Sequence, residues 1–276
     1  MGRRPTDIRR LYSAVALAPI LYVIVRYLPP VLFFGVVLLT AMIAVLEYYR
    51  LSFSREQLFP DAWIGSVATA ALLAACHWPG LTSVPTILLA TVLTVLMVRM
   101  ASHRGLASAL PDTAMVTFGV LYIGLTLGSY LLLRALPFGE SLVIFVVLVT
   151  WVGDAGAYYV GMRVGRRPLA PVISPKKTVE GLIGGLTAAV VAALAARAWL
   201  LPQYGLIEAL GLGCLLGAVG TLGDLAESAL KRSAGVKDSG AVIPAHGGML
   251  DRIDSLLFTG PIFYYYVTLV RGHLTP

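Results

Sequence analysis

The chain has 276 residues, of which 58% are hydrophobic and 13% are charged, and its mean hydropathy is +0.84. Soluble domains carry about 25% charged residues, so this composition excludes a soluble protein and a soluble enzyme with a single anchor. We attribute the net charge of +7 to Lys and Arg beside anionic lipid and a phosphorylated substrate, and expect no nucleic-acid partner.

Apolar stretches separated by proline, glycine or charge predict an all-α integral membrane protein, a polytopic bundle of about nine transmembrane helices. Each stretch has about 18–26 residues, enough to cross a hydrocarbon core of about 30 Å. The first follows Arg-rich residues but has no clear small-residue cleavage site, so we interpret it as a mature helix. The expected spans are 8–27, 30–50, 60–77, 83–101, 111–135, 141–164, 178–200, 206–231 and 252–271.

The distribution of Lys and Arg predicts a cytoplasmic N-terminus. With that orientation, 17 of the 21 Lys and Arg residues lie at the inner face. The exceptions are Arg26, Arg134, Arg197 and Arg271. Because cytoplasmic loops are enriched in Lys and Arg, this asymmetry favours N-in and, with nine spans, C-out.

The polar residues divide the chain into two parts. Residues 1–135, with five spans, are chemically plain, whereas residues 136–276, with four spans, hold most of the polar groups. Small residues recur at four-residue spacing, which is typical of closely packed membrane helices. These are Gly153, Ala157, Gly161 and Gly165; Gly181 and Gly185; and Gly213 and Gly217.

Six acids on four spans converge on the predicted cytoplasmic face: Asp154, Glu180, Asp224, Glu227, Asp251 and Asp254. At about 100° per residue, Asp224, Glu227, Ser228 and Lys231 share one helical stripe, and Asp251, Asp254 and Ser255 share another. Facing carboxylate oxygens without a His/Cys cluster favour Mg²⁺ over Zn²⁺. Two alternatives to a metal-binding role of these acids are ion pairing with neighbouring bases and a proton or ion relay in a transporter.

Basic residues surround these acids. They are Lys231, Arg232, Lys237 and Arg252 in the same region, and Arg166, Arg167, Lys176 and Lys177 in another inner loop. Acids for a metal beside bases for anions suit a polyphosphate substrate, so phosphoryl or nucleotidyl transfer is favoured over a relay. In His246-Gly247-Gly248, two glycines permit backbone amides to face phosphate oxygens, although His246 could equally be a simple turn residue. Neither a P-loop nor a Rossmann motif is present.

The stretch from Ser228 to Asp254 resembles the signature of the phosphatidate cytidylyltransferases over all 27 positions. The matching residues are Ser228, Leu230, Lys231, Arg232, Lys237, Asp238, Gly240, Ile243, Pro244, His246, Gly247, Gly248, Met249, Asp251, Arg252, Ile253 and Asp254. An upstream stretch is also similar: Asp154, Tyr158, Gly161, Ser174 to Thr178, Glu180 and Gly181.

The resemblance implies a Mg²⁺-dependent reaction of CTP with phosphatidate that yields CDP-diacylglycerol and pyrophosphate. It also implies a helical protein of the bacterial inner membrane, a polar cavity open to the cytoplasm and to lipid, a homodimer, and a second, monovalent cation such as K⁺.

From the residues and this resemblance we assign expected roles. The expected metal ligands are Asp224 and Asp251, assisted by Asp254, Glu227 and Asp154. The expected catalytic set comprises Asp224, Asp251, Asp254, Lys231, Arg232, Lys237 and His246. The expected substrate-binding set comprises Ser174, Lys176, Lys177, Ser228, Gly247, Gly248 and Arg252. Two other functions stay open at this point: a CTP-using kinase of a lipid alcohol, and an ion-coupled transporter.

Overall fold

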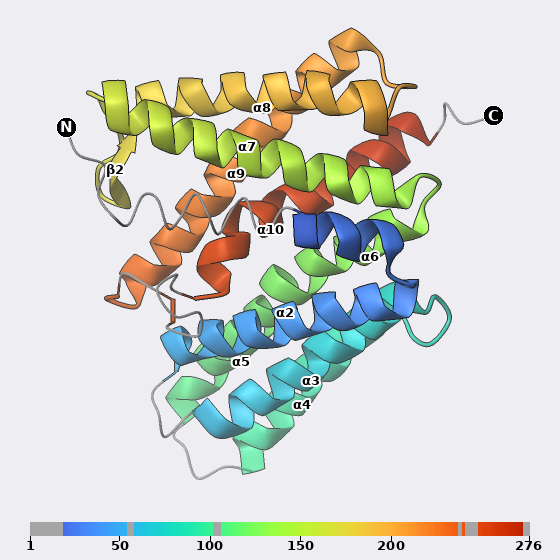
Figure 1. The fold of residues 1–276 in the computed structure, drawn as a ribbon. Coiled ribbons are helices and arrows are strands. Elements are labelled where there is room, and N and C mark those ends of the chain that lie inside the picture. Colours follow the sequence, from blue (N-terminus) through green and yellow to red (C-terminus); the bar gives the residue numbers. More distant parts are fainter. Residues whose placement is uncertain (1–18, 54–57, 102–105, 237–238, 241–247, 273–276) are drawn as a thin grey trace.

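The computed structural model describes residues 19–53, 58–101, 106–236, 239–240 and 248–272, which are overwhelmingly helical (Figure 1). The helices are α2 (Pro30–Ser52), α3 (Leu58–His77), α4 (Val84–Ala101), α5 (Ala109–Gly119), α6 (Thr126–Ala135), α7 (Gly139–Val164), α8 (Val179–Leu200), α9 (Leu206–Ser233) and α10 (Leu250–Tyr265). Shorter helical elements are η1 (Leu106–Ser108), η2 (Val120–Leu125) and η3 (Tyr266–Arg271). The predicted helical membrane fold is confirmed.

Among the residues that the structure describes, seven helical stretches are long and apolar enough to cross a membrane, which makes this a multi-pass membrane protein. They are Pro30–Ser52, Val84–Ala101, Ala109–Ala135, Gly139–Val164, Val179–Leu200, Leu206–Ser233 and Leu250–Arg271. The predicted span 60–77 coincides with α3, and the described end of the predicted span 8–27 is helical from residue 19. The count of nine and the N-in orientation stay predictions.

Close packing of α7 on α8 organises the C-terminal half of the molecule, where the two helices lie side by side and α9 crosses them (Figure 1). Glycines permit this approach: a Cβ at Gly185 would lie 2.9 Å from the Cβ of Ala157, and one at Gly153 would lie 3.2 Å from the Cβ of Ala189. The predicted packing role of the small residues on these helices is confirmed.

Helix α10 packs on α9 and also on α6 and α2, so the two parts expected from the sequence share an interface. The division at residue 135 itself stays a prediction. In Figure 1, the ends of α2, α7 and α9 and the start of α10 all point toward the left side of the molecule. The ends of these four elements therefore lie on the same side of the molecule.

A two-stranded antiparallel hairpin, which the sequence did not predict, lies between α7 and α8. Strand β1 (Pro168–Ala170) pairs with β2 (Ser174–Thr178). Glu180 Oε2 ties the start of the hairpin to α8 by accepting hydrogen bonds from the amides of Arg166 (2.9 Å) and Arg167 (3.1 Å). At the end of the hairpin, Thr178 Oγ1 caps α8 by accepting a hydrogen bond from Gly181 N. Sequence periodicity missed the hairpin because its strands have only three and five residues.

Candidate active site

Three carboxylates form the centre of the candidate site. Asp224 and Glu227 on α9 and Asp254 on α10 each place an oxygen within 4.8 Å of the others. The two α9 residues are three apart and therefore share a face of the helix. Gly223 brings the helices together, because a Cβ there would lie 2.7 Å from the Asp254 carbonyl oxygen. The two predicted acidic stripes therefore face one another. The acid of α10 that meets Asp224 and Glu227 is Asp254 and not Asp251.

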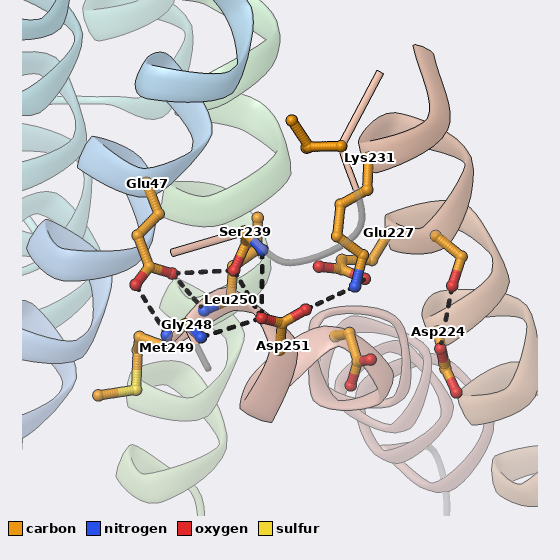
Figure 2. Close-up of polar contacts among 12 residues, drawn as sticks. Glu47, Asp224, Glu227, Lys231, Ser239, Gly248, Met249, Leu250 and Asp251 are labelled. Carbon is orange, nitrogen blue, oxygen red and sulfur yellow. Dashed lines mark hydrogen bonds and ion pairs between the residues drawn. The ribbon is translucent and has the colours of Figure 1, made fainter. Parts of the chain in front are cut away.

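Asp251 lies beside this cluster and has different partners. Its Oδ1 is 2.5 Å from Lys231 Nζ, and its Oδ2 accepts hydrogen bonds from Gly248 N (2.9 Å), Ser239 N (3.2 Å) and Ser239 Oγ (2.9 Å) (Figure 2). We expected Asp224 and Asp251 to hold a metal together. In the structure, Asp251 instead forms an ion pair with a lysine and accepts hydrogen bonds from backbone amides. Its assignment as a metal ligand stays a prediction.

The lysine that bridges the two acidic groups is Lys231. Its Nζ lies 2.5 Å from Glu227 Oε2 and 2.5 Å from Asp251 Oδ1. Helix α9 ends immediately afterwards in a Schellman motif, in which Val236 N donates to Lys231 O (2.9 Å) and Gly235 adopts a positive φ of 71°. This helix end fixes the turn from which Lys231 projects. The ion pairing considered as an alternative for Glu227 is therefore present.

A second lysine reaches the cluster from the hairpin. Lys177 Nζ on β2 lies 2.7 Å from Asp224 Oδ2, and both side chains are partly exposed. Ser228 Oγ is 3.5 Å from Asp224 Oδ1, one turn along α9. Asp154 on α7 lies close enough to Ser255, Asp224 and Lys177 to interact with them. The structure thus places Lys177, Ser228 and Asp154 beside the cluster, and their expected roles stay predictions.

Other predicted residues lie at the edge of this arrangement. Arg232 donates to the carbonyl oxygens of Ile173 (3.3 Å) and Val236 (3.1 Å), and therefore holds the hairpin against the end of α9. Lys176 and Arg252 are exposed, and Ser174 begins β2. The amide of Gly248, expected to face a phosphate, donates to Asp251 instead. Lys237, His246 and Gly247 lie outside the described residues.

Two buried acidic groups in the N-terminal helices were missed, because that part was interpreted as chemically plain. Glu47 on α2 is 1% exposed and contacts the start of α10. Asp61 on α3 and Asp112 on α5 both form ion pairs with Arg99 on α4. Both groups carry a signal in the sequence, since an ionisable residue within an apolar span is costly unless it has a partner.

The carboxylate cluster fits a hard divalent cation. Glu227 is fully buried, and its Oε1 accepts no hydrogen bond from any residue that the structure describes. A buried carboxylate oxygen without a donor is costly, and a bound cation would satisfy it. Three carboxylates supply oxygen ligands of the kind that Mg²⁺ prefers. Mg²⁺ itself stays a prediction.

Comparison with known proteins agrees with this chemistry. The Cytidylyltransferase family model matches residues 8–270. The chain is 42% identical over 161 residues to a phosphatidate cytidylyltransferase of Bacillus subtilis (57% of this chain, 59% of the relative). It is 46% identical over 134 residues to one of Synechocystis (49% and 45%) and 40% identical over 151 residues to one of Staphylococcus aureus (55% and 57%). The matched regions thus span about half the length of these relatives.

Proposed function

Because the chain belongs to the cytidylyltransferase family, we propose that it is a phosphatidate cytidylyltransferase, which makes CDP-diacylglycerol for phospholipid synthesis. A phosphate oxygen of phosphatidate attacks the α-phosphorus of CTP, a new P–O bond forms, and the bond to the β-phosphate oxygen breaks to release pyrophosphate. The observation that carries this proposal is the cluster of Asp224, Glu227 and Asp254 with Lys177 and Lys231 in contact with its acids.

In this proposal Asp224, Glu227 and Asp254 hold Mg²⁺, with Asp154 and Asp251 beside them. When bound, Mg²⁺ offsets charge on the phosphate oxygens of CTP. The resemblance to the family also suggests a monovalent cation such as K⁺.

The two lysines have a defined part in this chemistry. Lys177 and Lys231 each lie within 2.7 Å of a carboxylate oxygen of the site. An ammonium group at that distance can exchange a carboxylate for a phosphate oxygen with little movement, because both are anionic oxygen acceptors. The phosphate of phosphatidate is largely ionised near neutral pH, with a second pKa of about 6 for comparable phosphates, so the attacking oxygen needs no strong general base.

The proposal includes a location and an assembly. The protein lies in the bacterial inner membrane with the site open to the cytoplasm, from which CTP enters, and phosphatidate enters from the inner leaflet. The excess of Lys and Arg on that face supports this orientation. We also expect a homodimer, which cross-linking in native membranes would test.

The decisive experiment uses purified protein with phosphatidate, Mg²⁺ and CTP labelled on either the α- or the γ-phosphate. A cytidylyltransferase transfers the α-label to lipid and releases the γ-label as pyrophosphate. A lipid kinase transfers the γ-label, and a transporter consumes no CTP, so either result would overturn the proposal.

Replacement of the cluster acid in Asp224→Ala should abolish turnover while the protein remains folded in detergent.

A further inference from the structure

Glu47 links the N-terminal helices directly to the first turn of α10. Its carboxylate is buried, although the helix that carries it is one of the apolar candidate membrane spans. Its Oε1 accepts a hydrogen bond from Met249 N (3.0 Å), and its Oε2 accepts from Leu250 N (2.9 Å) and lies 3.2 Å from Ser239 Oγ (Figure 2). These contacts join residues about 200 positions apart in the sequence.

The start of α10 needs such an acceptor. The first amides of a helix have no partner within the helix and are usually satisfied by a Ser, Thr, Asp or Asn side chain at the N-cap. Here the N-cap residue is Met249, whose side chain accepts no hydrogen bond from the first turn of α10. Glu47 provides the missing acceptor from another helix, and its negative charge lies at the favourable, positive end of the α10 dipole.

Two glycines of the 228–254 stretch make room for this carboxylate. A Cβ at Gly240 would lie 2.7 Å from Glu47 Oε1. A Cβ at Gly248 would lie 2.5 Å from Glu47 Oε2 and would also overlap Ser239 Oγ. The backbone around the start of α10 is therefore shaped to receive the Glu47 side chain.

We propose that Glu47 is a positioning residue that fixes the start of α10 and, through it, Asp251 and Asp254. Ser239 lies between the two carboxylates, 3.2 Å from Glu47 Oε2 and 2.9 Å from Asp251 Oδ2, so Glu47 and Asp251 share one hydroxyl group. Asp254 lies one turn further along α10, in the carboxylate cluster. Glu47 acts on the site through these residues, and the link to activity rests on the proposed function.

The test is Glu47→Gln, which keeps the shape of the side chain but removes its charge and one acceptor oxygen. Amide hydrogen exchange, followed by mass spectrometry, reports on residues 249–258 without any need for activity. Loss of an N-cap acceptor should accelerate exchange at the start of α10 by about fivefold or more. In the same preparation, we expect the Mg²⁺ concentration for half-maximal CDP-diacylglycerol formation to rise, because Asp254 is less well placed.

Asp61→Asn is the matched control, because it also removes a buried acid of the N-terminal helices but one paired with Arg99. It should leave exchange at α10 and the Mg²⁺ requirement unchanged, whatever its effect on stability. Equal changes in both variants would indicate general destabilisation and overturn the proposal, as would unchanged exchange in Glu47→Gln.

A second variant decides the question if Glu47→Gln does not fold. Ser239→Ala removes only the hydroxyl shared with Asp251, and should accelerate exchange at the start of α10 in the same direction. Unchanged exchange in this variant would overturn the proposal. If the wild-type protein makes no CDP-diacylglycerol, the proposed function fails, whereas the exchange measurements still test the capping of α10 by Glu47.

Discussion

At the scale of single residues, two neighbouring lysines on β2 are expected to differ in their effect on activity. Successive side chains of a strand point to opposite faces, so Lys177 reaches Asp224 while Lys176 is exposed. Hydrogen bonds to charged groups contribute about 1.5–3 kcal/mol, so Lys177→Ala should raise the KM for CTP or phosphatidate about tenfold or more. Lys176→Ala should raise the same KM by a clearly smaller factor. Steady-state kinetics compare the two, and equal losses would contradict the assignment of Lys177 to the site.

A glycine next to Glu47 provides a second residue-scale prediction. Gly248→Ala should lower the free energy of unfolding by about 1–3 kcal/mol, because the new methyl group overlaps Ser239 and Glu47 in a packed region. Gly211→Ala on α9 is the control, since a Cβ there meets nothing within 4 Å and alanine is the better helix former. Thermal unfolding in detergent should show a lower midpoint for the first variant alone.

At the scale of elements, one arginine holds the hairpin to the end of α9. Arg232→Lys keeps the positive charge but loses the fork that donates to Ile173 and Val236. If Arg232 acts as a clamp, Arg232→Lys and Arg232→Ala should both speed proteolytic cleavage within β1 and β2. Full protection and full activity in Arg232→Lys, with activity lost in Arg232→Ala, would instead favour the charge-offsetting role expected from the sequence.

The helices and the acidic stripes could be predicted, because a membrane helix must satisfy its backbone hydrogen bonds internally and therefore needs a continuous apolar run. Spacing on one helix also placed Asp224 and Glu227 together. Spacing could not show which acid of α10 faces them, because Asp251 and Asp254 share a stripe and differ only by one turn. Glu47 was missed because its partners lie about 200 residues away, a distance at which helical periodicity carries no information.

At the scale of the whole molecule, the orientation in the membrane can be tested at two exposed positions separated by α8. Val172, between the hairpin strands, is 90% exposed, and Ile207, at the start of α9, is 89% exposed. Because α8 is long and apolar enough to span the bilayer, we expect these residues to lie on opposite sides of the membrane. The excess of Lys and Arg near the hairpin predicts that Val172 lies on the cytoplasmic side.

Single cysteines at these positions report the orientation directly. After Cys76→Ala and Cys214→Ala remove the native thiols, a membrane-impermeant maleimide should label Ile207→Cys in intact cells, after permeabilisation of the outer membrane where one is present. Val172→Cys should react only after the inner membrane is opened. The reverse labelling pattern would indicate the opposite membrane orientation, in which the cluster of Asp224, Glu227 and Asp254 lies on the side without CTP. The same two variants therefore test the orientation and, through the availability of CTP, the proposed reaction.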